Sequence, residues 1–177
     1  MKKTILFALL AISMAACKLK AEPAPASPSE EVYAPTEEHL AIGGIILGEY
    51  GYATRSKLVD KYGYPIERTD EHVIYELVDD DGYMWATGTY YFRDQKFYKV
   101  RYESSPLPEK DAKERALRKA IYTRKYKFLE TINGTDTSYV SRVKYDVNGE
   151  KKPLVVISIE EQKGGHVVVA TYEYIAN

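Results

Sequence analysis

Apolar and polar residues alternate along much of the C-terminal part of the chain with a period of two, which is typical of strands with one buried face. The alternation is clearest in 97–103, where Tyr98, Val100 and Tyr102 are expected to share a face. Stretches rich in aromatic and β-branched residues extend the prediction to six strands, at 73–78, 83–93, 97–103, 139–147, 154–161 and 166–175. Turn residues at 93–96, 148–149 and 163–165 separate neighbouring strands, so we expect antiparallel hairpins.

Two segments have the spacing of helices instead. In 54–62, Thr54 is a suitable N-cap, Leu58 and Tyr62 share a face, and Gly63 ends the helix. The segment 109–130 carries apolar residues at helical spacing, although from Tyr122 onward a strand is equally compatible with the pattern. The apolar stretch 41–47 predicts a short strand or a segment packed under a helix.

The predicted order of one helix followed by three strands occurs twice. Antiparallel meanders with a helix on one face are the natural packing for such an order. We therefore predict an α+β fold in which one or more antiparallel sheets carry helices on one face, built from two successive helix-β-β-β units. This domain spans 40–177, with possible halves 40–105 and 106–177.

The N-terminus has the pattern of an export signal. Positive residues at 2–3 precede an apolar run over 4–16, which is shorter than the roughly 20 helical residues that cross a membrane. The run ends in Met14-Ala15-Ala16-Cys17, which resembles the lipobox of bacterial lipoproteins, in which the cysteine is acylated and becomes the mature N-terminus. We expect a signal peptide over 1–16 and palmitate-type acylation of Cys17; the alternative is an ordinary signal peptide with an incidental cysteine. No second apolar run is long enough to span a membrane.

Residues 17–39 are expected to form a lipidated, flexible tether. The stretch 21–38 contains four prolines and few large apolar residues, so it cannot offset the entropy of ordering. Lys18 follows the cysteine in place of the Asp of an inner-membrane retention signal, which favours the outer membrane on its periplasmic side.

Charge and cysteine content exclude several classes of protein. The net charge is −1, which provides no global field for DNA or RNA, so we expect no nucleic-acid partner. One cysteine forms neither an internal disulfide nor a cysteine-rich zinc site. Tyrosine is abundant, with 17 residues against 4 Phe and 1 Trp.

Several common catalytic and metal motifs are absent from the sequence. It contains no Gly-x-Ser-x-Gly, no His-Glu-x-x-His and no phosphate-binding glycine loop. The three histidines, His39, His72 and His166, lack the spacing of a helical metal pair. The acidic run 79–81 is read as an exposed turn because an EF-hand would need a glutamate where Tyr90 stands. We expect no enzyme activity, no metal and no cofactor.

Two features are candidates for binding. Rigid amphipathic rings on the predicted hairpin suit protein contacts or sugar stacking. The candidates there are Tyr83, Trp85, Tyr91, Tyr98 and Tyr102. Basic residues of 109–130 suit an anionic surface. The candidates there are Arg118, Arg124 and Lys125, within the larger set Arg115, Arg118, Lys119, Arg124, Lys125 and Lys127. The alternatives are tyrosines that fill the core and a solvated helix face.

The first helix carries a pattern seen in small envelope lipoproteins. Gly51-Tyr52-Ala53-Thr54, Leu58-Val59 and Tyr62-Gly63-Tyr64-Pro65 resemble the Gly-x-Thr…Val…Leu-Gly-x-Pro pattern of the BamE (SmpA/OmlA) family. The β-lactamase-inhibitor-protein-like domains share that architecture. The resemblance implies a helix unit on an antiparallel sheet and a non-catalytic role in binding other envelope proteins.

Together these features predict an envelope lipoprotein that binds a protein partner or an envelope component through a tyrosine-rich sheet surface. One alternative is a glycan- or peptidoglycan-binding or processing protein, which a concave cluster of carboxylates and tyrosines would favour and a smooth convex sheet face would not. Another is an inhibitor or immunity lipoprotein.

Overall fold

The computed structural model describes residues 34–78, 82, 84–133 and 136–176, and the fold they form is α+β with an antiparallel sheet, as the sequence predicts. Eight strands pair in the order β3-β4-β5-β6-β12-β11-β8-β7. They are β3 (Glu67–Arg68), β4 (His72–Val78), β5 (Met84–Arg93), β6 (Lys96–Ser104), β7 (Phe128–Asn133), β8 (Asp136–Ser141), β11 (Val155–Gln162) and β12 (Gly165–Glu173). The sheet is continuous across the two predicted halves, because β6 pairs with β12.

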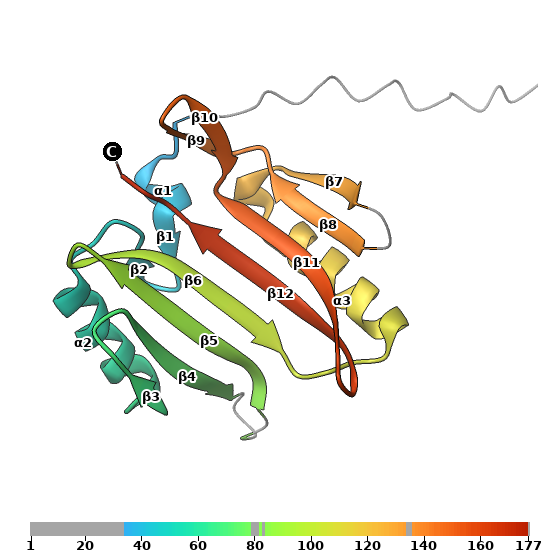
Figure 1. The fold of residues 1–177 in the computed structure, drawn as a ribbon, viewed down its shortest axis with the longest axis horizontal. Coiled ribbons are helices and arrows are strands. Elements are labelled where there is room, and N and C mark those ends of the chain that lie inside the picture. Colours follow the sequence, from blue (N-terminus) through green and yellow to red (C-terminus); the bar gives the residue numbers. More distant parts are fainter. Residues whose placement is uncertain (1–33, 79–81, 83, 134–135, 177) are drawn as a thin grey trace, which may run out of the picture.

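Two helices lie on one face of this sheet, behind it in Figure 1. Helix α2 (Gly51–Tyr62) lies behind the half that contains β4 and β5, and it buries Thr54 and Leu58. Helix α3 (Glu109–Tyr122) contacts β12, β11 and β8. Its buried residues are Ala112, Ala116 and Ala120. Their small side chains let the helix backbone approach the sheet closely, and the front face of the sheet carries no helix among the described residues.

Shorter elements complete the fold. Helix α1 (Glu37–Leu40) leads into the two-residue strands β1 (Ala41–Ile42) and β2 (Ile45–Ile46). A 3₁₀ turn η1 (Arg124–Tyr126) follows α3, and β9 (Lys144–Val147) pairs with β10 (Glu150–Pro153) in a separate hairpin. Residues 37–40 are thus helical although the sequence predicts an extended tether up to residue 39.

Most tyrosines of the sheet fill the layer between sheet and helices. One continuous row of rings runs from α2 across four strands to η1, with neighbouring centroids 5.6–6.0 Å apart. Its members, in spatial order, are Tyr62, Tyr75, Tyr90, Tyr102, Tyr172 and Tyr126. The row ends where the Tyr126 hydroxyl donates a hydrogen bond to the His39 carbonyl, at 3.0 Å. Of the candidate binding tyrosines, Tyr102 belongs to this row, as the core-filling alternative has it, whereas Tyr91 and Tyr98 do not.

Several predicted strands have different limits in the structure. The strand predicted over 139–147 is broken between β8 and β9, where the buried Ser141 hydroxyl donates to the Val143 carbonyl and accepts from the Val155 amide. The turn at 148–149 closes the β9–β10 hairpin rather than linking two long strands. After Tyr122 the chain leaves the helix, and the strand alternative holds from Phe128.

The second half therefore contains more strands than the three predicted for it. Helix α3 is followed by β7, β8, the β9–β10 hairpin, β11 and β12, so the repeat of two helix-β-β-β units is not confirmed. In the first half a short β3 precedes the three long strands β4, β5 and β6.

Candidate functional site

Two depressions bring together residues that could bind a ligand. We call the first the arginine cleft; it has a volume of about 730 Å³ and is lined by Gly51, Tyr52, Arg55, Arg68, Thr69, Asp70, Glu71, Tyr91, Phe92, Arg93, Asp94, Gln95 and Tyr98. We call the second the α3 groove; it has a volume of about 380 Å³ and is lined by Trp85, Ala86, Tyr102, Ser104, Arg115, Arg118, Lys119, Tyr122, Val168 and Ala170.

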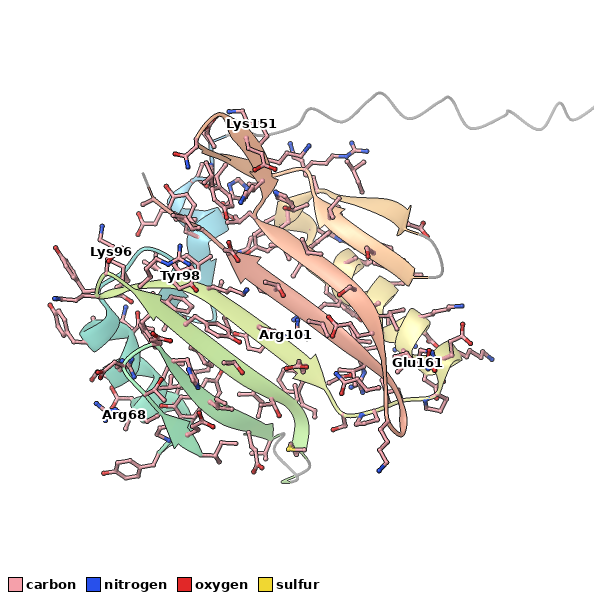
Figure 2. The ribbon with its side chains drawn as sticks, viewed as in Figure 1. Arg68, Lys96, Tyr98, Arg101, Lys151 and Glu161 are labelled. Carbon is pink, nitrogen blue, oxygen red and sulfur yellow. The ribbon has the colours of Figure 1, made fainter. Side chains whose placement is uncertain are left out.

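The arginine cleft forms where the start of α2 meets the β5–β6 turn. The amide of Gly51 donates to the Gln95 carbonyl at 2.7 Å. A Cβ at residue 51 would lie 2.9 Å from Phe92 Cδ1 and 3.2 Å from that same carbonyl, so only glycine fits this approach. The turn itself places Asp94 and Gln95 at positive φ, at 49° and 61°. Figure 2 shows Arg68 on β3 and Tyr98 on β6 on this same side of the molecule.

Arginine side chains of the cleft stack on aromatic rings. The Arg55 guanidinium lies 3.9 Å from the centroid of Phe92 and donates from Nη2 to the Asp70 carbonyl at 2.7 Å. The Arg93 guanidinium lies 4.5 Å from the centroid of Tyr98. Burial, and then the charge of Arg68, lower the pKa of Arg55. Stacking holds both planar groups, the Asp70 carbonyl also holds Arg55, and no carboxylate of the described residues forms an ion pair with either.

Carboxylates line the same cleft without neutralising its arginines. Asp70, Glu71 and Asp94 are all exposed, and within the described part of the chain none of them forms an ion pair with Arg55 or Arg68. The Nη1 atom of Arg55 is buried and has no hydrogen-bond partner among these residues. The cleft therefore presents positively charged arginines and negatively charged carboxylates beside the rings of Tyr52, Tyr91 and Tyr98.

The α3 groove has an apolar floor and a basic wall. The floor comes from the helix-facing side chains of β5, β6 and β12, among them Ala86, Val168 and Ala170. The wall is the flank of α3 that presents Arg118 and Lys119. Rings of Trp85, Tyr102 and Tyr122 lie around it.

Lys119 is the unusual member of the groove. Its Nζ lies 5.8 Å from the centroid of the Tyr102 ring, and burial lowers its pKa. Within the described residues it has no carboxylate partner, whereas Arg118 pairs with Glu114 one turn earlier on the same helix.

Two β-bulges place the candidate residues Trp85 and Tyr98 in these depressions. Met84 pairs with Val78 and Ala86 with Leu77, so Trp85 is the extra residue of one bulge. Further along the hairpin Tyr91 pairs with Lys99 and Phe92 with Phe97, which makes Tyr98 the extra residue of a second bulge. An extra residue breaks the alternation of faces and redirects its side chain. This is why Trp85 lies with the helix-facing Ala86 in the α3 groove.

The predicted binding residues are thus divided between two places. Trp85, Tyr102 and Arg118 meet in the α3 groove, and Tyr91 and Tyr98 line the arginine cleft. The candidates Cys17 and Tyr83 lie outside the described residues, as does the acidic run 79–81.

Two of the basic candidates belong to neither depression. The Lys125 ammonium donates to the carbonyls of Glu38 and Ala41, at 2.7 and 2.8 Å, so it fastens α1 to the domain. This corrects its assignment to a binding surface. Arg124 is exposed beside it on η1.

The three histidines make separate local contacts and do not form one cluster. His72 Nε2 lies 2.9 Å from Glu67 Oε1, His39 Nδ1 lies 3.1 Å from the Thr36 hydroxyl, and the His166 backbone bridges Leu107. No group of three metal-ligating side chains occurs in the described ranges.

Sequence reasoning missed the residues that come from separate segments. Arg55, Arg68 and Arg93 lie on α2, β3 and β5, and no local spacing connects them. Tyr52 and Tyr122 are exposed helix residues, and exposure at a depression has no sequence signature.

No family model matches the chain, and no curated protein or solved structure matches it. Among residues 34–78, 82, 84–133 and 136–176, no helix is long and apolar enough to cross a membrane. What the protein does must therefore follow from the chemistry of the two depressions and from its N-terminal sequence.

Proposed function

We propose that this protein is a lipid-anchored, non-catalytic binding protein of the bacterial cell envelope, and that its arginine cleft binds a charged envelope glycan of the peptidoglycan class. The observation that carries the proposal is the joint presence in one cleft of three tyrosines, three exposed carboxylates and three arginines.

The anchor and the tether support the location. Acylation at Cys17 would hold the protein in a membrane, since each buried methylene contributes about 0.8 kcal/mol. The stretch 21–38 is rich in proline and poor in large apolar residues, which suits an extended spacer. A domain on such a spacer can reach a polymer layer that lies away from the bilayer. The outer membrane, on its periplasmic side, is the location we propose.

The chemistry of the cleft suits a polymer of sugar rings that also carries carboxylates. Tyr52, Tyr91 and Tyr98 offer ring faces and hydroxyls together, which match the mixed apolar and polar faces of a sugar. Exposed carboxylates accept hydrogen bonds from sugar hydroxyls, and stacked guanidinium groups bind carboxylates in a two-pronged geometry. A ligand with carboxylates would also neutralise arginines that lack a carboxylate partner in the described protein.

Binding without catalysis is the simpler role for this cleft. A carboxylic acid that protonates a glycosidic oxygen has its pKa raised by an apolar environment. Asp70, Glu71 and Asp94 are all exposed to water, where no such environment exists. The cleft therefore has the groups to hold a glycan and lacks a shielded acid to cleave it.

Co-sedimentation with isolated peptidoglycan tests the proposal. The intact protein should pellet with the polymer in zwitterionic detergent and should be displaced by soluble polymer fragments. Tyr52→Ala should weaken binding by at least about tenfold, because one ring face and one hydroxyl are lost. Tyr52 is 78% exposed, so the substitution should leave stability nearly unchanged.

Tyr64→Ala is the matched control. Tyr64 is 91% exposed and does not line the cleft. If the wild-type protein does not pellet with the polymer, or if Tyr52→Ala and Tyr64→Ala bind equally well, the proposed ligand is wrong.

A protein partner is a second candidate function. Leu117 and Ile121 on α3 are 45% and 50% exposed, and they lie one helical turn apart. Exposed apolar pairs of this kind are common at contacts between proteins. A photo-crosslinker at residue 121 in cells, with residue 110 as the control position, should capture one defined protein if this candidate is right.

A further inference from the structure

The α3 groove contains a desolvated ammonium group without a counter-charge. Lys119 lies above the Tyr102 ring, half-buried between α3 and the sheet, and burial lowers its pKa. No carboxylate pairs with it among the residues that the structure describes. A charged group removed from water and left unpaired destabilises the protein unless something compensates it.

The groove supplies further positive charge but no negative charge. Arg115 and Arg118 line the same wall of α3, and the lining includes no acidic residue. Glu114 pairs with Arg118 and is not part of the lining. An anion in the groove would therefore meet Lys119 and Arg115, together with the Arg118 that Glu114 already pairs with, and no acidic residue of the lining.

The floor of the groove determines what the anion must carry. Ala86, Val168 and Ala170 are 2%, 5% and 3% exposed and present only apolar atoms toward α3. The rings of Trp85 and Tyr122 form the sides. These surfaces suit an apolar body next to the anionic group.

The size of the groove limits the ligand to one small molecule. Its volume of about 380 Å³ is near the lower end of ligand pockets, which span roughly 300–1,000 Å³. The polymer proposed for the arginine cleft would not fit, so the ligand of the α3 groove is a different molecule.

We propose that the α3 groove binds a small amphiphilic anion, in which a single carboxylate or phosphate group is attached to a short apolar body, with the Lys119 ammonium as its counter-ion. A fatty-acid carboxylate and an alkyl phosphate both have this chemistry. The anionic group lies against Lys119 and Arg115, and the apolar body lies on Ala86 and Ala170.

The fluorescence of Trp85 reports directly whether a ligand occupies the α3 groove, because Trp85 is the single tryptophan and lines the groove. The intact acylated protein, held in nanodiscs of zwitterionic phospholipid, is titrated with octanoate, octyl phosphate and octanol while Trp85 emission is recorded. Empty nanodiscs and free indole provide the correction for partitioning and for non-specific quenching.

We expect a saturable change with at least one of the two anions, and binding of octanol at least about tenfold weaker than that of the better anion. The preferred anion identifies the source as a carboxylate or a phosphate. Octanol that binds as tightly as both anions would overturn the proposal, since the groove would then be merely apolar. Absence of a saturable signal with all three ligands would also overturn it.

Two substitutions separate the role of the charge from that of the fold. Lys119→Met retains the length of the side chain and should weaken binding of the preferred anion at least about tenfold, while octanol binding stays unchanged. Lys119→Arg should retain binding. Lys110→Met is the matched control, because Lys110 is an exposed lysine of α3 outside the groove. Equal anion affinity in Lys119→Met and Lys110→Met would show that Lys119 is not the counter-ion.

Discussion

Arg101 on β6 reaches over β12 and donates a hydrogen bond to Glu160 on β11, with Nη2 2.9 Å from Oε2. The same nitrogen lies 3.2 Å from Oε1 of Glu103. Between the two carboxylates lies β12, where Val169 is only 1% exposed although it points to the face without helices. Figure 2 shows Arg101 near the centre of that face. Charged side chains thus cover apolar residues where no helix does.

Replacing Arg101 by methionine should lower the free energy of unfolding by about 1 kcal/mol. The substitution leaves Glu103 and Glu160 facing each other with like charge, although their partial exposure weakens the effect. Urea denaturation measures the change. Lys113→Met removes a fully surface ion pair with Glu109 and should lower the free energy of unfolding clearly less than Arg101→Met does. Equal losses in the two variants would contradict a role for Arg101 in covering β12.

The row of tyrosines makes stability sensitive to alkaline pH. Burial raises the pKa of Tyr102 to about 12, and it also raises the pKa values of Tyr90, Tyr126 and Tyr172 above the usual value near 10. The folded state therefore retains protons that the unfolded state loses. The stabilising contribution is complete below pH of about 10 and is lost as the pH rises to about 12 and beyond.

Thermal unfolding between about pH 8 and pH 12 tests this dependence, with tyrosinate absorbance recorded alongside. Melting temperature should be flat up to about pH 10 and then fall, and the buried tyrosines of the row should ionise only together with unfolding. Tyr102→Phe removes one titrating group and should make the fall less steep. Complete tyrosinate formation in the folded protein near pH 10 would show that these rings are accessible to water.

Gly88 permits the close packing of the tyrosine row. A Cβ at this position on β5 would lie 3.1 Å from Tyr90 Cε2 and 3.3 Å from Tyr102 Cε1. Tyr90 is fully buried and cannot move aside. Gly88→Ala should therefore destabilise the protein by about 1–3 kcal/mol in urea denaturation, although alanine suits a strand better than glycine does. A stabilised variant would mean that the row has space to shift.

Acylation of Cys17 is testable in cells. Mass spectrometry of the mature protein should find an N-terminal cysteine that carries fatty acids. Cys17→Ala should prevent labelling by a clickable palmitate analogue and release the protein from the outer-membrane fraction, while the fold of 40–177 remains intact. A wild-type protein without fatty acid would contradict the lipobox assignment.

Local patterns predicted the elements well because strands and helices are set largely by periodicity and turn residues. The hairpin at 84–104 and the helix that ends at Gly63 lie within a few residues of their predicted limits. The end of α3 was not predictable, because 122–131 suits both a helix and a strand. The break at Ser141 was not predictable either, since it depends on hydrogen bonds to Val143 and to the distant Val155.

By itself the sequence determined the α+β class, the hairpins at 84–104 and 155–173 and the lipobox-like N-terminal pattern, because each depends on residues that are neighbours in the chain. Only the tertiary structure decided which rings are core and which line a depression. Trp85 and Tyr98 illustrate the reason: a single extra residue in one strand of a pair redirects the side chain, and only the pairing with the other strand reveals it. Arg55 and Arg68 meet in one cleft through packing of α2 beside β3, and Lys119 becomes desolvated only when α3 closes on the sheet.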